Sequence, residues 1–408
     1  MYIDRAIEGE VKRSIRLGVN SPFNSIHEMQ RYVSSLVFST PLPPTTLTSP
    51  DHMVITYCGI SLSVIQWRNA LKQLVRETHA EIKDILGDDD YGVNIPDLPK
   101  DDWTETRRNY SWMEAGPYVP NPQCLLENLV TQKKLVSKDS DGNVLLKTPE
   151  LWDLLNKLSR VTKLIIWLCY FTPGGVARVS EFWDHKITNG DRPRTIFRHG
   201  SFFWFVTRRT KPESLTGRAS FILTQMCPEV CRFLNVYFTL LKPLESDIVH
   251  LLKGERCAQI TSQFLCVQEG EHIPCTTLLD WIHEFMRDYC MVGAGAREYR
   301  HFVVEISRLF IGSAGIVDED DTDTTTAQRG HSGNTARTRY AIEEGQLPSI
   351  SSDIMNEYAN SSSLWWQFCD LRDGYPPLQP IIARRRIRDT VANAPIGTSF
   401  HVSISETY

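Results

Sequence analysis

Apolar residues recur at intervals of three and four along much of the chain, which is the spacing expected of helices with one buried face. Two such helices are predicted near the N-terminus, one through Met29 and Leu36 and a longer one that begins after Ser61. No strand pattern competes with them before about Asp102. The sequence therefore predicts a helical N-terminal domain over residues 1–140.

A second series of helices follows the polar stretch 137–143, which we interpret as the domain boundary. Thr148 and Pro149 open the first of them, because threonine caps helix N-termini and proline suits the first helical position. The Pro-Gly-Gly sequence at 173–175 stops this helix, so Arg178 is expected near the start of the next one, where backbone amides favour an anion. Further helices are predicted over 228–241, 278–289 and 297–310.

Runs of aromatic and branched residues between these helices predict a small antiparallel sheet. The expected strands are 195–197, 202–207 and 220–223. A His-Gly turn at 199–200 joins the first two, and Lys211 lies in the connection to the third. The predicted fold class is thus mainly α, of the α+β type.

The pattern becomes irregular after Tyr340, and we treat residues 346–408 as a C-terminal tail. The Trp365-Trp366 pair could reach a neighbouring protomer or pack back on its own domain. The arginine-rich run 384–388 fits a nuclear localisation signal, a DNA-backbone contact or a solvated cluster. The sequence leaves these alternatives open.

The length and net charge of the chain add little to this prediction of its fold and domains. A chain of 408 residues with 41% hydrophobic content is large enough for two domains with substantial cores. The net charge of -5 argues against a protein whose whole surface binds nucleic acid, because phosphate binding is largely electrostatic. A local basic cleft remains compatible with this charge, since acidic stretches elsewhere supply much of the negative total.

Cysteine spacing and hydropathy predict an intracellular protein without a metal or cofactor. None of the ten cysteines forms a Cys-x-x-Cys pair, and Cys227 and Cys231 lack a nearby histidine, so reduced core thiols are expected. The N-terminus has no apolar leader, and the longest apolar run, 164–171, is too short to cross a bilayer. We therefore expect a soluble protein with no membrane partner.

Several dispersed residues have the chemistry needed to break a phosphodiester bond. Arg178 and Arg300 suit the two non-bridging oxygens, because a guanidinium donates bidentately and stays charged. Lys211 can protonate the departing oxygen, and His331 can hydrogen-bond a non-bridging oxygen or assist proton transfer near neutral pH. Tyr340 would be the nucleophile. A tyrosyl phosphate ester conserves the energy of the broken bond, so resealing requires neither ATP nor a metal.

Each of these residues also has a purely structural interpretation. Arg178 could pair with Glu181 on the surface of a helix, and Tyr340 could be a half-buried packing residue. Arg300 borders an apolar helix face and needs a partner, which would be either a carboxylate such as Glu305 or a bound phosphate. The order of the residues along the chain favours function over packing.

That order resembles the active site of tyrosine recombinases. The Ala-Arg-Val-Ser-Glu segment at 177–181 is similar to their first arginine box, and Tyr-Arg-His at 299–301 is similar to the second. Gly-His-Ser at 330–332 followed by Tyr340 has their histidine-to-tyrosine spacing, and Lys211 stands where their strand-turn lysine belongs. The catalytic set implied by the resemblance is Arg178, Lys211, Arg300, His331 and Tyr340.

The resemblance covers roughly residues 148–344, and the 202–211 hairpin looks most like that of eukaryotic, fungal Crypton-type transposon recombinases. The chain departs from the family at Arg297, where a histidine or lysine usually precedes the second arginine by three residues. We class three residues as possible assistants: Glu181, Arg297 and His301.

The resemblance implies a helical core-binding domain over 1–140 and a catalytic domain over 148–345. It also implies site-specific cleavage and rejoining of double-stranded DNA through a 3′-phosphotyrosyl intermediate, in the recombination or integration of a mobile element. Assembly of several protomers on DNA and a nuclear location belong to the same expectation. Two rivals are a catalytically inactive module that keeps the fold for DNA or protein contact, and a type IB topoisomerase, which uses similar groups.

Overall fold

The computed structural model describes residues 29, 46–87, 101–114, 135–138, 144–209, 220–312 and 352–381. Contacts divide the chain into two units, 1–47 and 48–408, and nearly all of the described residues belong to the second. The described part is mainly helical with small antiparallel sheets, in agreement with the predicted class. Met29 is helical, and the rest of the first predicted helix lies outside the described residues.

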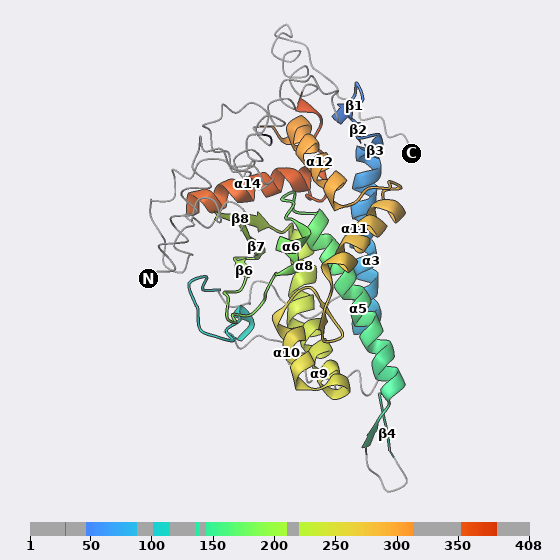
Figure 1. The fold of residues 1–408 in the computed structure, drawn as a ribbon, viewed down its shortest axis with the longest axis vertical. Helices are drawn as coiled ribbons and strands as arrows, with labels where there is room; N and C mark the ends of the chain where they lie inside the picture. The colour runs from blue at the N-terminus through green and yellow to red at the C-terminus, as the bar shows by residue number, and fades with distance from the viewer. Residues whose placement is uncertain are drawn as a thin grey trace. The chain divides into compact units, whose positions relative to one another are not determined.

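Two long helices, α3 (Val64–Leu86) and α5 (Thr148–Phe171), pack side by side (Figure 1). The side chain of Ser63 caps α3 by accepting a hydrogen bond from the Gln66 amide, and the helix ends at Gly87, which has φ +79°. The last turns of α5 are buried on every side, so this helix lies in the centre of the core. It begins one residue earlier than the capping pattern predicts: Lys147 is the N-cap and makes no side-chain cap hydrogen bond, and Thr148, the expected cap, is the first helical residue.

The region before α3 contains strands that the sequence pattern did not predict: β1 (Thr46–Thr48), β2 (Val54–Tyr57) and β3 (Ile60–Ser63). The expectation that no strand precedes Asp102 is therefore wrong. β2 and β3 pair as an antiparallel hairpin, and its turn residues Cys58 and Gly59 have φ +48° and +82°. The side chains of Ile55 and Tyr57 are both buried, with the alternation of a strand. The strand is so short that its apolar residues could not be distinguished in the sequence from the apolar pattern of the following helix.

The predicted three-stranded sheet is confirmed as β6 (Ile196–His199), β7 (Phe202–Arg209) and β8 (Ser220–Gln225), in the order β6-β7-β8. Ile196 pairs with Phe205, which pairs with Thr224 on the other side. Phe203 and Phe205 face the main core, whereas Trp204 packs in a smaller cluster with Trp103. The sheet therefore separates two apolar layers.

The remaining helices surround α5 and the sheet. In chain order they are α6 (Val179–Trp183), α8 (Pro228–Val236), the π-helical turn η3 (Tyr237–Leu241), α9 (Lys242–Lys253), α10 (Glu255–Gln263), α11 (Cys275–Asp288), α12 (Ala296–Ile306), the π-helical turn η4 (Ser307–Ile311) and α14 (Ser352–Phe368). A 3₁₀ turn, η2 (Trp112–Glu114), and the strands β4 (Val136–Lys138), β5 (Val144–Leu146), β9 (Val267–Gln268) and β10 (Glu271–His272) complete the described elements. The predicted helices 228–241 and 297–310 each end in a π-helical turn.

The predicted domain boundary lies between paired strands. β4 and β5 are antiparallel neighbours, with Val136 opposite Leu146, and the polar stretch 137–143 that we interpreted as the domain boundary begins within β4. The helices before and after it, α3 and α5, contribute to one hydrophobic core. The division into a DNA-binding domain and a catalytic domain, and the functions of both, stay predictions.

Candidate functional site

The loop between α5 and α6 carries Arg178 at the position that the sequence indicated. Thr172 follows the last residue of α5, and its hydroxyl donates a hydrogen bond to the Leu168 carbonyl at 2.7 Å. Gly174 then turns the chain with φ +74°. Arg178 is the N-cap of α6, and its backbone N–H donates to Glu181 Oε2 at 2.9 Å. The carboxylate thus fixes the start of the helix and with it the Cα of Arg178.

The second arginine is positioned by the packing of α12. The helix begins after Gly295, whose N–H donates to Glu298 Oε2 at 3.0 Å. On the buried face, the Tyr299 hydroxyl donates to the Phe171 carbonyl at 3.3 Å, which ties α12 to the last turn of α5. Because the register is fixed in this way, Arg300 lies on the half-buried border of the helix that faces the Arg178 loop.

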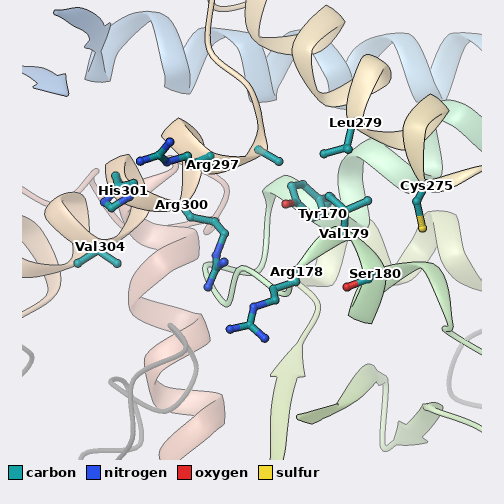
Figure 2. Close-up of a pocket in the computed structure, with 11 residues that line it drawn as sticks. Tyr170, Arg178, Val179, Ser180, Cys275, Leu279, Arg297, Arg300, His301 and Val304 are labelled. Atoms are coloured by element: carbon teal, nitrogen blue, oxygen red, sulfur yellow. The ribbon is translucent and has the colours of Figure 1, made fainter. Parts of the chain in front are cut away.

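The two arginine segments meet at one pocket of about 660 Å³ (Figure 2). Three arginines, Arg178, Arg297 and Arg300, line it together with His301. The other lining residues are mostly apolar: Tyr170, Val179, Ser180, Cys275, Leu279, Ala296 and Val304. The pocket therefore combines clustered positive charge with an apolar wall, and it contains no carboxylate among its lining residues.

The positive charge at Arg300 has no counter-charge in the described part of the chain. Neither Arg300 nor Arg297 forms an ion pair with a described carboxylate, and Glu305, the partner considered for Arg300, pairs with Arg308 instead. Figure 2 shows the guanidinium groups of Arg300 and Arg178 extending into the same space. A half-buried cation without a partner is costly, so this space favours an anion.

Among the described residues, Arg178 has one carboxylate neighbour. Its Nη1 atom is 3.6 Å from Glu181 Oε1, and the two side chains are 40% and 10% exposed. The predicted pairing therefore exists, but a single contact at this distance leaves most of the five guanidinium donors available to a ligand. Glu181 acts mainly through the backbone cap described above.

Tyr170 is a pocket residue that the sequence analysis missed. Its ring is buried, and its hydroxyl donates to the Ala177 carbonyl at 3.4 Å, one residue before Arg178. Burial raises the pKa of Tyr170 well above its usual value, and the positive charge of Arg300 only partly opposes this. The phenol therefore stays neutral and braces the loop. Its place in an apolar helix gave no sequence signal for this contact.

The proposed assistants on α12 lie at the pocket in different ways. Figure 2 shows the Arg297 side chain directed away from Arg178, although it lines the same pocket. The imidazole of His301 stacks on Tyr57 of the β2–β3 hairpin. Cys275 and Leu279 of α11 form part of the opposite wall, and only the folded chain brings them there.

Lys211, His331 and Tyr340 lie outside the described residues, so their roles stay predictions. In the described part of the chain, no group of three histidine, cysteine or acidic side chains could hold a metal ion. No described helix is long and apolar enough to span a membrane.

Comparisons with known proteins do not identify a relative. No family model, curated protein or solved structure matches the chain. The functional inference therefore depends on the chemistry and geometry of the pocket.

Proposed function

We propose that this protein cleaves and rejoins double-stranded DNA at specific sites through a tyrosyl phosphate intermediate. Arg178 and Arg300 bind the two non-bridging oxygens of the scissile phosphate, with His331 as a third donor. The Tyr340 oxygen attacks phosphorus and releases its proton to water while the bond to the 5′ oxygen breaks, and Lys211 supplies a proton to that leaving oxygen. Attack by a 5′ hydroxyl on the phosphotyrosyl bond reverses the step and restores the tyrosine.

One observation carries this proposal. Arg178 and Arg300, which come from distant parts of the sequence, line one pocket, and Arg300 has no carboxylate partner among the described residues. Two guanidinium groups directed into one space suit a ligand with two anionic oxygens on one centre, which is the geometry of a phosphodiester.

The apolar wall supports an ester over inorganic phosphate. Tyr170, Leu279 and Val304 place carbon atoms beside the cationic groups, and Leu279 is 43% exposed. Sugar carbons flank the phosphate in a nucleic-acid strand, so a site that binds this group benefits from apolar surface next to the arginines. Inorganic phosphate would leave that wall in contact with water.

The same proposal includes a nuclear location and the assembly of several protomers on DNA. A true duplex clamp binds through phosphates and loses affinity steeply as salt rises. The net charge of -5 favours one alternative function. In this alternative the protein is catalytically inactive and keeps the fold only for contact with DNA or protein.

The test is the trapping of a covalent protein–DNA adduct on nicked duplexes drawn from the DNA that flanks the gene. Wild-type protein is expected to form an adduct at a 3′ phosphate that survives denaturing electrophoresis, whereas Tyr340→Phe forms none. Salt-sensitive binding without an adduct on any of these duplexes would favour the inactive DNA-binding protein. An adduct followed by relaxation of supercoiled DNA without strand exchange would favour a topoisomerase.

A further inference from the structure

The helix α14 packs back onto its own chain, which answers a question that the sequence left open. Trp365 and Trp366 are 1% and 4% exposed, and both belong to the main core. Figure 1 shows α14 lying along the sheet, and the two elements are in contact through β8. The tryptophan pair is therefore part of the unit that contains the arginine pocket.

Trp365 lies directly against Gly174 in the loop that leads to Arg178. A Cβ atom added to Gly174 would be 2.4 Å from Cγ and 2.6 Å from Cδ2 of the indole, and its three nearest contacts would all be with Trp365. Gly174 also has φ +74°, a conformation that favours glycine. Close approach and backbone geometry therefore require glycine at the same position.

This contact supports the middle of the arginine loop. Thr172 anchors one end of the loop to α5, and Glu181 caps the other end at Arg178. Between these anchors, Gly174 meets the flat face of a buried indole, which limits how far the loop can move towards α14. Trp365 thus bounds, on this side, the loop that leads to Arg178.

The same helix reaches the element that carries the second arginine. The ring of Phe368, at the end of α14, packs on Phe310 of η4 with a centroid distance of 4.8 Å. η4 directly continues α12, and α14 is in contact with it. On its other side α14 is held by Arg68, which donates from Nε to the Phe368 carbonyl at 2.7 Å and from Nη2 to the Leu378 carbonyl at 2.9 Å. α14 therefore bridges the two arginine-bearing elements.

We propose that Trp365 is a positioning residue that acts through Gly174 to hold the Arg178 guanidinium at the distance from Arg300 that a phosphate ester requires. This inference rests on the proposed function, because it concerns the same pocket. Trp365 itself does not line the pocket, so its effect must pass through the loop. Removal of the indole allows the loop to relax towards α14 and separates the two arginines.

A double-mutant cycle tests this coupling. The affinity for a fluorescently labelled duplex at low salt is measured for wild type, Trp365→Leu, Arg178→Ala and the double variant, all well below their unfolding temperatures. A charge-assisted hydrogen bond contributes about 1.5–3 kcal/mol, so each single variant is expected to bind about tenfold or more weakly. The double variant should bind no more weakly than Arg178→Ala alone. Full additivity of the two effects would overturn the proposal.

Trp366→Leu is the matched control. Trp366 is equally buried but stacks on Phe202 of β7, with a centroid distance of 6.1 Å, and is not among the nearest contacts of Gly174. This variant should lose stability much as Trp365→Leu does, while its duplex affinity stays within about twofold of wild type. An equal loss of affinity in both variants would mean that Trp365 contributes only core packing.

A second measurement needs no ligand and separates this inference from the proposed function. Hydrogen exchange of the amides between 172 and 178 should be faster in Trp365→Leu than in Trp366→Leu. Equal exchange in this loop would reject the positioning role, whatever the protein does to DNA. If wild-type protein binds no duplex, the proposed function fails while the exchange comparison still decides the role of Trp365.

Discussion

The ring of Tyr57 stacks on the imidazole of His301, with centroids 4.0 Å apart and planes inclined by 12°. Tyr57 belongs to the β2–β3 hairpin and is 6% exposed, whereas His301 lies beside Arg300 at the edge of the pocket. The hairpin, which the sequence pattern did not predict, therefore braces the helix that carries the second arginine. This contact links an N-terminal element of the unit directly to the candidate site.

Tyr57→Leu is expected to lower both stability and duplex affinity. The stack contributes about 0.5–1.5 kcal/mol beyond the burial of the ring, and its loss lets the pocket edge of α12 move. Tyr57→Phe keeps the ring and serves as the control. Thermal unfolding and anisotropy titrations should rank the proteins as wild type, Tyr57→Phe and then Tyr57→Leu. Equal affinity of all three would show that the brace does not affect the site.

Replacement of Arg300 should affect catalysis more than folding. Arg300→Lys keeps a charge but loses the bidentate fork, and Arg300→Ala loses both, so single-turnover adduct formation should fall by about 10²–10³ in the alanine variant and less in the lysine variant. Unfolding in urea should show no loss of stability, because the cation has no described carboxylate partner. A stability loss that parallels the activity loss would indicate a structural arginine.

Salt dependence distinguishes the pocket arginines from other surface arginines. The slope of log affinity against log salt should decrease by about one for Arg178→Ala, because one phosphate contact is lost. Arg256 of α10 is exposed and does not line the pocket, so Arg256→Ala is the control and should leave the slope unchanged. Identical slopes for the two variants would place the bound phosphates elsewhere.

His185 should make the fold sensitive to acid. Burial lowers the pKa of its imidazole to about 3, and Nδ1 lies 3.1 Å from Thr195 Oγ1. In the unfolded state the imidazole takes up a proton near pH 6.5, whereas in the folded state it stays neutral until about pH 3. The unfolding free energy therefore decreases as pH falls from about 6.5 towards 3, by up to about 1.4 kcal/mol per pH unit. Urea titrations of wild type and His185→Phe should show a flatter profile for the variant in this range. Parallel profiles would contradict the prediction.

The buried ion pair between Arg194 and Asp101 should be intolerant of single changes. Both side chains are 0% exposed, with Nη2 and Oδ1 2.5 Å apart, and Asp101 Oδ2 also accepts from the Arg198 amide at 2.9 Å. Asp101→Leu leaves a buried cation and should cost about 3–5 kcal/mol of unfolding free energy. The double variant with Arg194→Met should recover a large part of this loss in urea unfolding. A double variant as unstable as Asp101→Leu alone would show that the charge is not the cause.

The elements that sequence analysis predicted well are those whose signals are local. The apolar period of α5, the Pro-Gly-Gly stop and the aromatic strands β6 and β7 each depend on neighbouring residues, and they placed Arg178 at the start of α6. These predictions of single elements required no knowledge of tertiary contacts. Arg178 and Arg300 line one pocket, but no local signal grouped them; the resemblance to the two arginine boxes did.

The missing features depend on tertiary contacts. The β2–β3 hairpin is too short to show a strand period of its own, and Tyr170 looked like any buried residue of α5. The wall contributed by Leu279 exists only because α11 packs beside α6. Nothing in the local sequence of Trp365 indicates that it approaches Gly174, because that contact joins segments that are far apart in the sequence.

The hydrogen bond from Arg68 to the Phe368 carbonyl spans 300 positions of the chain. During synthesis α3 leaves the ribosome long before α14, so the Arg68 guanidinium meets its acceptor only after α14 has emerged. The closure of so long a loop is slow compared with the formation of local helices. The arginine loop thus acquires its tryptophan support only after α14 has been made, so a nascent chain that has not yet made α14 carries both arginines without this contact.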